Sequence, residues 1–212
     1  MIQNPDLTYE TNLWAYYPHI AGLDEAGRGA LAGPVAVGAV ILPPNETLLT
    51  QSLAGVRDSK QMTPLERESL APRIKEVVLT WSVGFASAEE IDSQGIVLAT
   101  RLAALRALHG LSLAPHYLLT DFRLELPQLD ISQTALVKGD ALCLSIAAAS
   151  VLAKTARDQF MCELDLYYQG YGLGKHKGYG TQAHRSAMKR LGVSPIHRRS
   201  FQVKEISASH LP

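Results

Sequence analysis

The sequence has little cysteine and lacks any long hydrophobic run. Its two cysteines, Cys143 and Cys162, form neither a CxxC motif nor the framework of a secreted disulfide protein. The longest apolar stretch, near residues 141–153, is shorter than the roughly 20 residues that a membrane-spanning helix needs. The first 14 residues also lack the basic and apolar regions of a signal peptide. We therefore expect a cytoplasmic protein without a membrane partner.

The chain also lacks a net charge, yet its charges are unevenly distributed. Residues 1–137 contain 9 Lys and Arg against 15 Asp and Glu, whereas residues 138–212 contain 11 against 5. A basic end in a neutral protein is typical of binding to a polyanion such as nucleic acid, but a solvated helix face has the same composition. Charge alone leaves both interpretations open.

Hydrophobic patterning predicts an α/β domain with a basic helical C-terminal extension. The 212 residues, 47% of them hydrophobic, can bury one sizeable core. Apolar and alternating runs predict strands, and amphipathic runs predict helices. Strands are expected at 19–26, 33–43, 80–87, 116–121 and 134–140, the first two as a hairpin, and helices at 87–110, 141–169 and 182–192.

A further helix start is marked by a capping box. Thr63 is the expected N-cap, Pro64 occupies the first helical position, and Glu66 follows Thr63 by three residues. Ser59 and Lys60 are then expected in the loop before this helix.

Acidic residues follow the ends of three expected strands. Asp24, Asp121 and Asp140 each lie at or just past such an end, and Glu25 adjoins Asp24. Because α/β proteins build sites where strand ends meet, we expect these carboxylates to lie together. Such a cluster needs cations, and oxygen ligands favour Mg²⁺ or Mn²⁺. Two ions of this kind can cleave a phosphodiester, one by activating water and one by stabilising the leaving oxygen.

Each carboxylate also has a structural interpretation. Asp140, before an apolar helix, could be only an N-cap, and Asp121 could be only a turn residue. Asp24 and Glu25 are harder to explain in this way, because they are embedded between apolar segments where an unpaired charge is costly to bury.

Two glycine-rich segments could contact nucleic acid. Gly27 and Gly29 could form only a tight turn, but Arg28 between them favours a loop whose backbone approaches a phosphate. The second segment, residues 170–181, could be only a linker. Basic and aromatic residues are interleaved with its glycines, and this pattern favours a loop that contacts nucleic acid. These residues are Lys175, His176, Lys177 and Tyr179.

The order of these motifs resembles the ribonuclease HII family over nearly the whole chain. The matching stretches are "GLDEAGRGALAGPV", "DSK", "KGDALCLSIAAASVLAKTARD", "HKGYGTQAHRSAM" and "HRRSF". The resemblance implies an RNase H-like fold, a mixed central sheet flanked by helices, over residues 1–165. It also implies that residues 166–212 form a helical extension packed on this catalytic domain.

The resemblance further implies an activity and a site. The activity is endonucleolytic hydrolysis of the RNA strand of RNA–DNA hybrids, and incision 5′ of a single ribonucleotide embedded in duplex DNA. The implied ligands of two divalent ions, Mn²⁺ or Mg²⁺, are Asp24, Glu25, Asp121 and Asp140. The implied nucleic-acid contacts are Gly27, Arg28, Gly29, Lys60, Lys175, Lys177 and Tyr179, with Tyr179 at the junction with DNA. We expect the enzyme to act as a monomer.

The chain departs from the family pattern after the third carboxylate. The family has glycine there, whereas this chain has Phe122, for which a positive φ would be costly. A changed turn would redirect Asp121 and leave Glu125 or Asp130 as a substitute ligand. We retain Asp121 as the expected ligand.

Three residues of the basic half are given structural roles, and two other functions stay open. His184 is expected to hold the C-terminal helix against the sheet, although it could assist proton transfer, and Arg157 and Asp158 are expected to form a buried ion pair. The alternatives are a nuclease of the same fold that acts on DNA and a non-catalytic module that binds hybrids. The carboxylates argue against the module, because a pure binder gains nothing from acidic groups that face phosphates.

Overall fold

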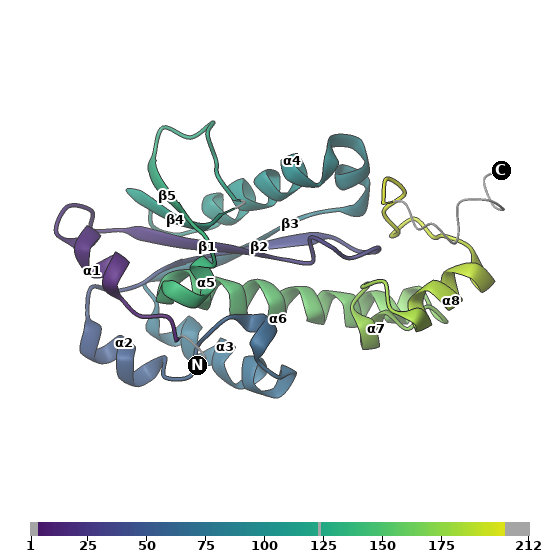
Figure 1. The fold of residues 1–212 in the computed structure, drawn as a ribbon, viewed down its shortest axis with the longest axis horizontal. Coiled ribbons are helices and arrows are strands. Elements are labelled where there is room, and N and C mark those ends of the chain that lie inside the picture. The colour runs from purple at the N-terminus through teal and green to yellow at the C-terminus, as the bar shows by residue number, and fades with distance from the viewer. Residues whose placement is uncertain (1–3, 123, 202–212) are drawn as a thin grey trace.

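The computed structural model describes residues 4–122 and 124–201, which form a mixed sheet between helical layers (Figure 1). The strands are β1 (Ile20–Ala26), β2 (Val35–Ile41), β3 (Thr80–Ala86), β4 (Tyr117–Asp121) and β5 (Ser132–Leu136). Their order across the five-stranded sheet is β3-β2-β1-β4-β5. β1 pairs antiparallel with β2 and β2 with β3, so the expected hairpin is confirmed, while β1 pairs parallel with β4 and β4 with β5.

Helices cover both faces of this sheet. Those of the first half of the chain are α1 (Thr8–Trp14), α2 (Glu46–Ser52), α3 (Pro64–Val77) and α4 (Ala88–His109). Those of the second half are α5 (Gly139–Leu142), α6 (Leu144–Tyr167), α7 (Leu173–His176) and α8 (Gln182–Leu191). None of the helices in these described ranges is long and apolar enough to cross a membrane.

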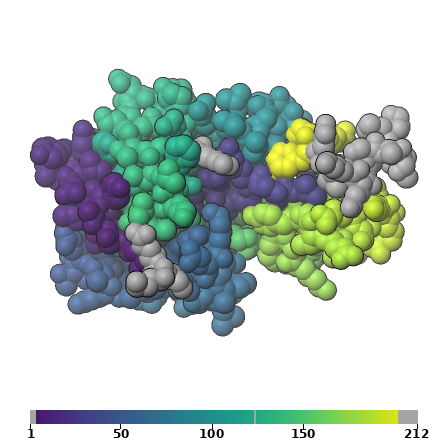
Figure 2. Space-filling view, in the orientation of Figure 1, coloured from purple at the N-terminus to yellow at the C-terminus, as the bar shows by residue number. Residues whose placement is uncertain are grey.

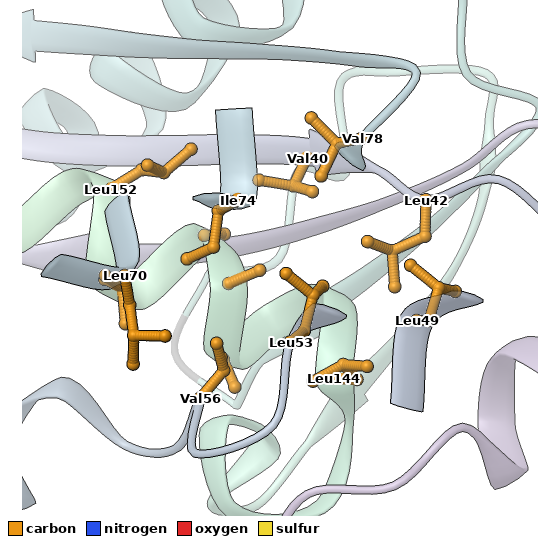
Figure 3. Packing of buried hydrophobic residues seen from close by; sticks show 14 of the residues in the cluster. Val40, Leu42, Leu49, Leu53, Val56, Leu70, Ile74, Val78, Leu144 and Leu152 are labelled. Carbon is orange, nitrogen blue, oxygen red and sulfur yellow. The ribbon is translucent and has the colours of Figure 1, made fainter. Parts of the chain in front are cut away.

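Two cores lie on opposite faces of the sheet because the side chains of β2 alternate. Val37 and Ala39 pack with α4 on one face, whereas Val40 packs with α2, α3 and α6 on the other. Figure 3 shows this second core, in which Val40 lies near Ile74 of α3 and Leu152 of α6. The RNase H-like layering expected from the sequence is confirmed.

Helix α6 passes unusually close to the centre of the sheet. A Cβ on Gly22 of β1 would lie 2.3 Å from the main chain of Ser145, and a Cβ on Gly38 of β2 would lie 2.3 Å from the Ala149 carbonyl oxygen. Glycine at both positions therefore allows the helix to lie directly against β1 and β2. Asp24, which pairs with Gly38 in the register of the two strands, is buried under this contact.

The capping box is confirmed, whereas the long helix expected over 141–169 is wrong at its start. The Thr63 side chain accepts from the Glu66 N–H, and Glu66 accepts from the Thr63 N–H. The long helix is interrupted because Cys143 is extended, which separates α5 from α6. The helix expected over 87–110 also bends, since Gly95 has a φ of 80°.

The C-terminal segments gather at one end of the molecule, where Figure 2 shows them in yellow-green. α7 and α8 pack around Met161 of α6, and Ala32, in the loop between β1 and β2, joins the same cluster. Residues far apart in the sequence are therefore held together beyond the end of β1.

Candidate active site

Three carboxylates meet where β1 and β4 end. Asp24 and Glu25 lie near the carboxyl end of β1, and Asp121 is the last residue of β4. Because the two strands are parallel neighbours, with Leu23 opposite Thr120, their ends lie at the same edge of the sheet. One oxygen from each carboxylate lies within 4.8 Å of the others. The convergence expected from the strand ends is therefore present for these three.

Three oxygens of this cluster are buried without hydrogen-bond partners among the described residues, two from Asp24 and one from Glu25. Asp24 is 1% exposed, and neither its Oδ1 nor its Oδ2 has a hydrogen-bond partner among the described residues; the same holds for Glu25 Oε2. Burial, followed by the charge of Glu25, raises the pKa of Asp24 well above its usual value. Burial also raises the pKa of Glu25. Such a group of hard oxygen atoms suits divalent cations, which would supply the missing partners.

Asp140 reaches this edge by a different route from the one expected. β5 ends at Leu136, so Asp140 does not end a strand, and it is not the N-cap of α5, which is Lys138. Its position follows from Gly139, whose N–H donates to Asp121 Oδ1 at 3.0 Å. Burial, followed by the charge of Asp58, raises the pKa of Asp140 to about 6. We call Asp24, Glu25, Asp121 and Asp140 the acidic edge.

Lys60 is a cation that faces the acidic edge. It lies in a 3₁₀ turn over Ser59–Gln61 rather than in a plain loop, and Asp58 caps that turn by accepting from the Lys60 N–H at 2.9 Å. Its Nζ lies 3.6 Å from Asp140 Oδ2. Burial would lower the pKa of Lys60, but the charges of Asp24 and Asp140 reverse this effect and raise it. Lys60 therefore stays charged beside the carboxylates.

Phe122, which follows Asp121, does not adopt a positive φ. Among the described residues other than glycine, only Lys138 and Lys177 have positive φ. Phe122 is 56% exposed and adopts an ordinary conformation, so the anticipated strain is absent. The alternative ligands Glu125 and Asp130 are exposed and lie outside the three-carboxylate cluster.

The glycine-arginine-glycine loop, residues 27–29, extends directly from the end of β1. Gly27 has a φ of 84°, and a Cβ there would lie 1.8 Å from Arg157 Nε, so only glycine fits. A Cβ on Gly29 would meet no heavy atom within 4 Å, and its surface is open to solvent. Arg28 Nη1 lies 3.8 Å from Glu25 Oε1.

Two buried arginines support this loop and the residues that follow it up to Pro34, and the sequence did not reveal how. Arg157 donates to the carbonyls of Ala32 and Pro34, whereas Arg198 donates to those of Arg28 and Gly33. Burial, followed by the charge of Arg157, lowers the pKa of Arg198 to about 9. The "HRRSF" stretch was the only sign of Arg198 in the sequence, and its spacing does not indicate what the guanidinium contacts.

The expected ion pair between Arg157 and Asp158 is wrong. Asp158 instead forms ion pairs with Lys154, whose Nζ lies at 2.7 Å, and with Arg67, whose Nη2 lies at 3.3 Å. Successive helical residues point in different directions, so Arg157 faces the loops while Asp158 faces α3.

The second glycine-rich segment packs against the first. The N–H groups of Leu31 and Ala32 donate to the Gly178 carbonyl at 2.8 and 3.3 Å. A Cβ on Gly178 would lie 2.3 Å from the Ala32 oxygen, which requires glycine there. The ring of Tyr179 lies 5.4 Å from the Arg157 guanidinium. Tyr179 is therefore held close to the loop that follows β1.

The two lysines of the second segment differ in their surroundings. Lys175 is exposed, whereas the ammonium of Lys177 donates to the Cys162 thiol and to the Gly174 carbonyl. His184 is fully buried, which fits the structural role expected for it more closely than a role at the acidic edge.

Sequence comparison finds close relatives over almost the whole chain. The family model for ribonuclease HII matches residues 21–204. A ribonuclease HII of Desulfitobacterium hafniense is 53% identical over 92% of this chain and 73% of its own length. A ribonuclease HII of Dehalococcoides mccartyi is 50% identical over 93% of this chain and 92% of its own.

Solved structures resemble the fold as well. Ribonuclease H2 from Pyrococcus horikoshii superposes with a TM-score of 0.71 at 27% identity, covering 87% of this chain and 94% of that one. The RNase HII from Archaeoglobus fulgidus, solved as a complex with PCNA, gives 0.72 at 25% identity, covering 88% and 96%. Because the family model and the relatives both span nearly the entire sequence, this chain belongs to the ribonuclease HII family.

Proposed function

We propose that the acidic edge cleaves the RNA strand of RNA–DNA hybrids and incises duplex DNA on the 5′ side of a single embedded ribonucleotide. The ribonuclease H class follows from the family, and the residue assignment is ours. The observation that carries the assignment is the set of buried, unpartnered oxygens of Asp24 and Glu25 beside Asp121.

The acidic edge would hold two divalent ions, Mg²⁺ or Mn²⁺, through Asp24, Glu25, Asp121 and Asp140. When bound, such ions activate the attacking water and stabilise the departing 3′ oxygen. Without such cations, the charges of these carboxylates would repel the phosphate, which argues against a role in binding alone. Lys60, which keeps its charge beside Asp140, would contact a phosphate oxygen near the cut.

The neighbouring loops would read the nucleotide. The open surface of Gly29 leaves room for a sugar beside the backbone, and Arg28 and Gly27 complete a loop that can sense the 2′-hydroxyl. Tyr179 would pack on the sugar just beyond the ribonucleotide, where a deoxyribose without the hydroxyl lets the ring lie flush. Lys175 would contact flanking phosphates, and Lys177 would do so after leaving Cys162.

We further propose that the enzyme acts as a monomer in the cytoplasm. Cys143 and Cys162 are both free thiols, as a reducing compartment requires.

Cleavage of three labelled duplexes tests the function. We expect cleavage of a continuous RNA–DNA hybrid and of a DNA duplex carrying one ribonucleotide, with Mg²⁺ or Mn²⁺, and no cleavage of an all-DNA duplex. Comparable cleavage of the all-DNA duplex would instead indicate a DNA nuclease. Binding of the hybrid without cleavage, with either metal in excess, would identify a non-catalytic module.

Substitution of single carboxylates tests which of them belongs to the site. Asp121→Asn should be inactive, because the amide removes a charge from the cluster while its oxygen can still accept from the Gly139 N–H. Glu125→Gln and Asp130→Asn are matched controls and should remain active, since both residues are exposed and outside the cluster. Steady-state rates on the hybrid provide the measurement. An active Asp121→Asn beside an inactive control would show that the ligand has moved.

A further inference from the structure

Three histidines form a contiguous cluster in the C-terminal part of the chain, away from the acidic edge. His176 comes from α7, His184 from α8, and His197 from the segment after α8. The ring centroids of His176 and His184 are 4.2 Å apart and nearly parallel, and those of His184 and His197 are 5.3 Å apart. His184 is fully buried and His197 is 2% exposed. Among the described residues, no carboxylate forms an ion pair with any of the three.

The hydrogen bonds of His197 fix the position of its proton. The Ser194 N–H lies 3.0 Å from His197 Nδ1, and a backbone N–H can only donate. Nδ1 of His197 is therefore an acceptor, and the proton of the neutral ring is on Nε2. That Nε2 lies 3.2 Å from Nε2 of His184. One of these two nitrogens must donate to the other, and His197 is the one that holds a proton there.

The hydrogen bonds of His184 independently indicate that His197 donates to His184. Its Nδ1 lies 3.1 Å from the carbonyl oxygen of Tyr179, which can only accept. His184 therefore carries its proton on Nδ1, and its Nε2 is free to accept from His197. The complete relay runs from the Ser194 N–H through His197 and His184 to the Tyr179 carbonyl.

The third histidine supports the relay without joining it. The Gly178 N–H donates to His176 Nδ1 at 3.2 Å, and His176 Nε2 lies 2.9 Å from the Tyr171 carbonyl oxygen, so both ring nitrogens bond to the main chain. The Tyr171 ring packs on His197 at 4.8 Å. Burial, followed by the charge of His176, lowers the pKa of His184 to about 4. Burial, followed by the charge of His184, lowers the pKa of His197 to about 4. The relay thus stays uncharged near neutral pH.

The relay ends on the main chain of the residue proposed to read the DNA junction. The Tyr179 carbonyl accepts from both His184 and the Thr181 N–H, the latter at 2.8 Å. We infer that His184 and His197 are positioning residues that fix the Tyr179 backbone and thereby set the preference for a ribonucleotide followed by DNA. This inference rests on the role proposed above for Tyr179.

The tautomers can be observed without substrate. Long-range ¹H–¹⁵N spectra of the full chain, with ¹⁵N-labelled histidine, report which ring nitrogen carries each proton. At neutral pH we expect the proton of His197 on Nε2 and that of His184 on Nδ1, with both rings neutral. The opposite tautomer at either ring, or a charged ring at neutral pH, overturns the relay.

Substrate preference tests what the relay does. The measured quantity is the ratio of kcat/KM on a single-ribonucleotide duplex to kcat/KM on a continuous hybrid. His197→Phe keeps a ring but removes the donor to His184, and we expect it to lower the ratio about tenfold, as the loss of one buried hydrogen bond implies. His197→Gln retains an N–H donor and should restore much of the ratio. His116→Phe, at an exposed ring that stacks on His19, is the control and should leave the ratio unchanged.

Tyr179→Ala separates failure of the relay from failure of the proposed function. We expect Tyr179→Ala to lower the ratio by itself, and His197→Phe to lower it no further when added to Tyr179→Ala. A normal ratio in Tyr179→Ala would refute the role of Tyr179, and the inference with it, while hybrid cleavage would still support the nuclease. A lowered ratio in Tyr179→Ala, together with equal losses on both substrates in His197→Phe, would mean that the histidines only hold the fold.

Discussion

Asp24→Asn should abolish cleavage while leaving hybrid binding intact or improved. Asp24 is buried at the centre of the acidic edge, and both of its oxygens lack partners among the described residues. Asparagine has nearly the same shape but no charge, so it weakens the capture of divalent ions and reduces the repulsion of phosphates. We expect a loss on the order of 10³-fold in kcat, comparable to the largest losses from removing one preorganised electrostatic group. Asp140→Asn should act in the same direction.

The same substitution should stabilise the metal-free protein. The folded chain raises the pKa of Asp24, so the folded state binds a proton more tightly than the unfolded state. Stability linked to this group is present below its unfolded pKa of about 4 and is lost as the pH rises above it. At neutral pH, Asp24→Asn removes that penalty. Its Tm in a chelator should exceed that of the unmodified chain, and added Mg²⁺ should raise its Tm less.

Two measurements decide this prediction. Cleavage rates at saturating Mg²⁺ and Mn²⁺ are compared with binding of the uncleaved hybrid, with Asp130→Asn as the matched control because Asp130 is exposed. Turnover near that of the unmodified chain, with metal in excess, would remove Asp24 from the site. A lower Tm without metal would contradict the electrostatic argument even if activity were lost.

The sequence predicted those parts of the fold that depend on local patterns. Residues 20–26 form a strand because an apolar run leads into Asp24 and Glu25, and α3 begins at Pro64 because Thr63 and Glu66 form a capping box. These signals require only neighbouring residues. They were sufficient to place three of the four expected carboxylates at one edge of the sheet.

The sequence could not predict the break before α6, because its cause lies far away in the chain. Glu10 of α1 is fully buried, and its Oε1 accepts from the Ser145 N–H at 2.7 Å and from the Cys143 thiol at 3.0 Å. It therefore caps the first turn of α6 from another element, a role that its position in α1 does not indicate. The break at Cys143 in turn determines where α5, the short helix that carries Asp140, ends.

Arg157 shows a similar limit, since a charged residue inside a helix is usually paired or solvated. The expected partner was its neighbour Asp158, whereas among the described residues the guanidinium donates to carbonyl groups of two loops. A sequence pattern can identify a buried charge, but carbonyl acceptors exist at every residue and leave no signature.

Arg157→Met should cause the largest loss of stability among single substitutions near the site. Arg157 is fully buried, and its three nitrogens donate to the carbonyls of Pro34 at 2.8 Å, Lys177 at 3.0 Å and Ala32 at 3.2 Å. Methionine fills much of the volume but leaves these three acceptors without partners. Each buried, unsatisfied polar group costs about 1–3 kcal/mol, and the relief of desolvating a charge offsets part of this sum. We expect a loss of about 3 kcal/mol in the free energy of unfolding.

Arg157→Lys should recover little of this stability. An ammonium group is a single point of charge, and it cannot direct three separate N–H groups at carbonyls from two different loops. Arg190→Met is the matched control, because Arg190 also donates to a carbonyl, that of Gly170 at 3.1 Å, but is exposed. It should change the free energy of unfolding by less than about 0.5 kcal/mol. Denaturant unfolding of the three variants provides the comparison.

The position of Arg157 also predicts where the structure opens. The guanidinium bridges the loop after β1 to the segment that carries Tyr179, and the N–H groups of Leu31 and Ala32 bond across the same junction to Gly178. In Arg157→Met these two amides should exchange with solvent much faster, whereas amides in the centre of β2 should exchange at a rate set by global stability. Cleavage should fall on both the hybrid and the single-ribonucleotide duplex, because the loop after β1 serves both. Unchanged exchange at Leu31 and Ala32, despite a lower stability, would show that Arg157 supports the core and does not join the two loops.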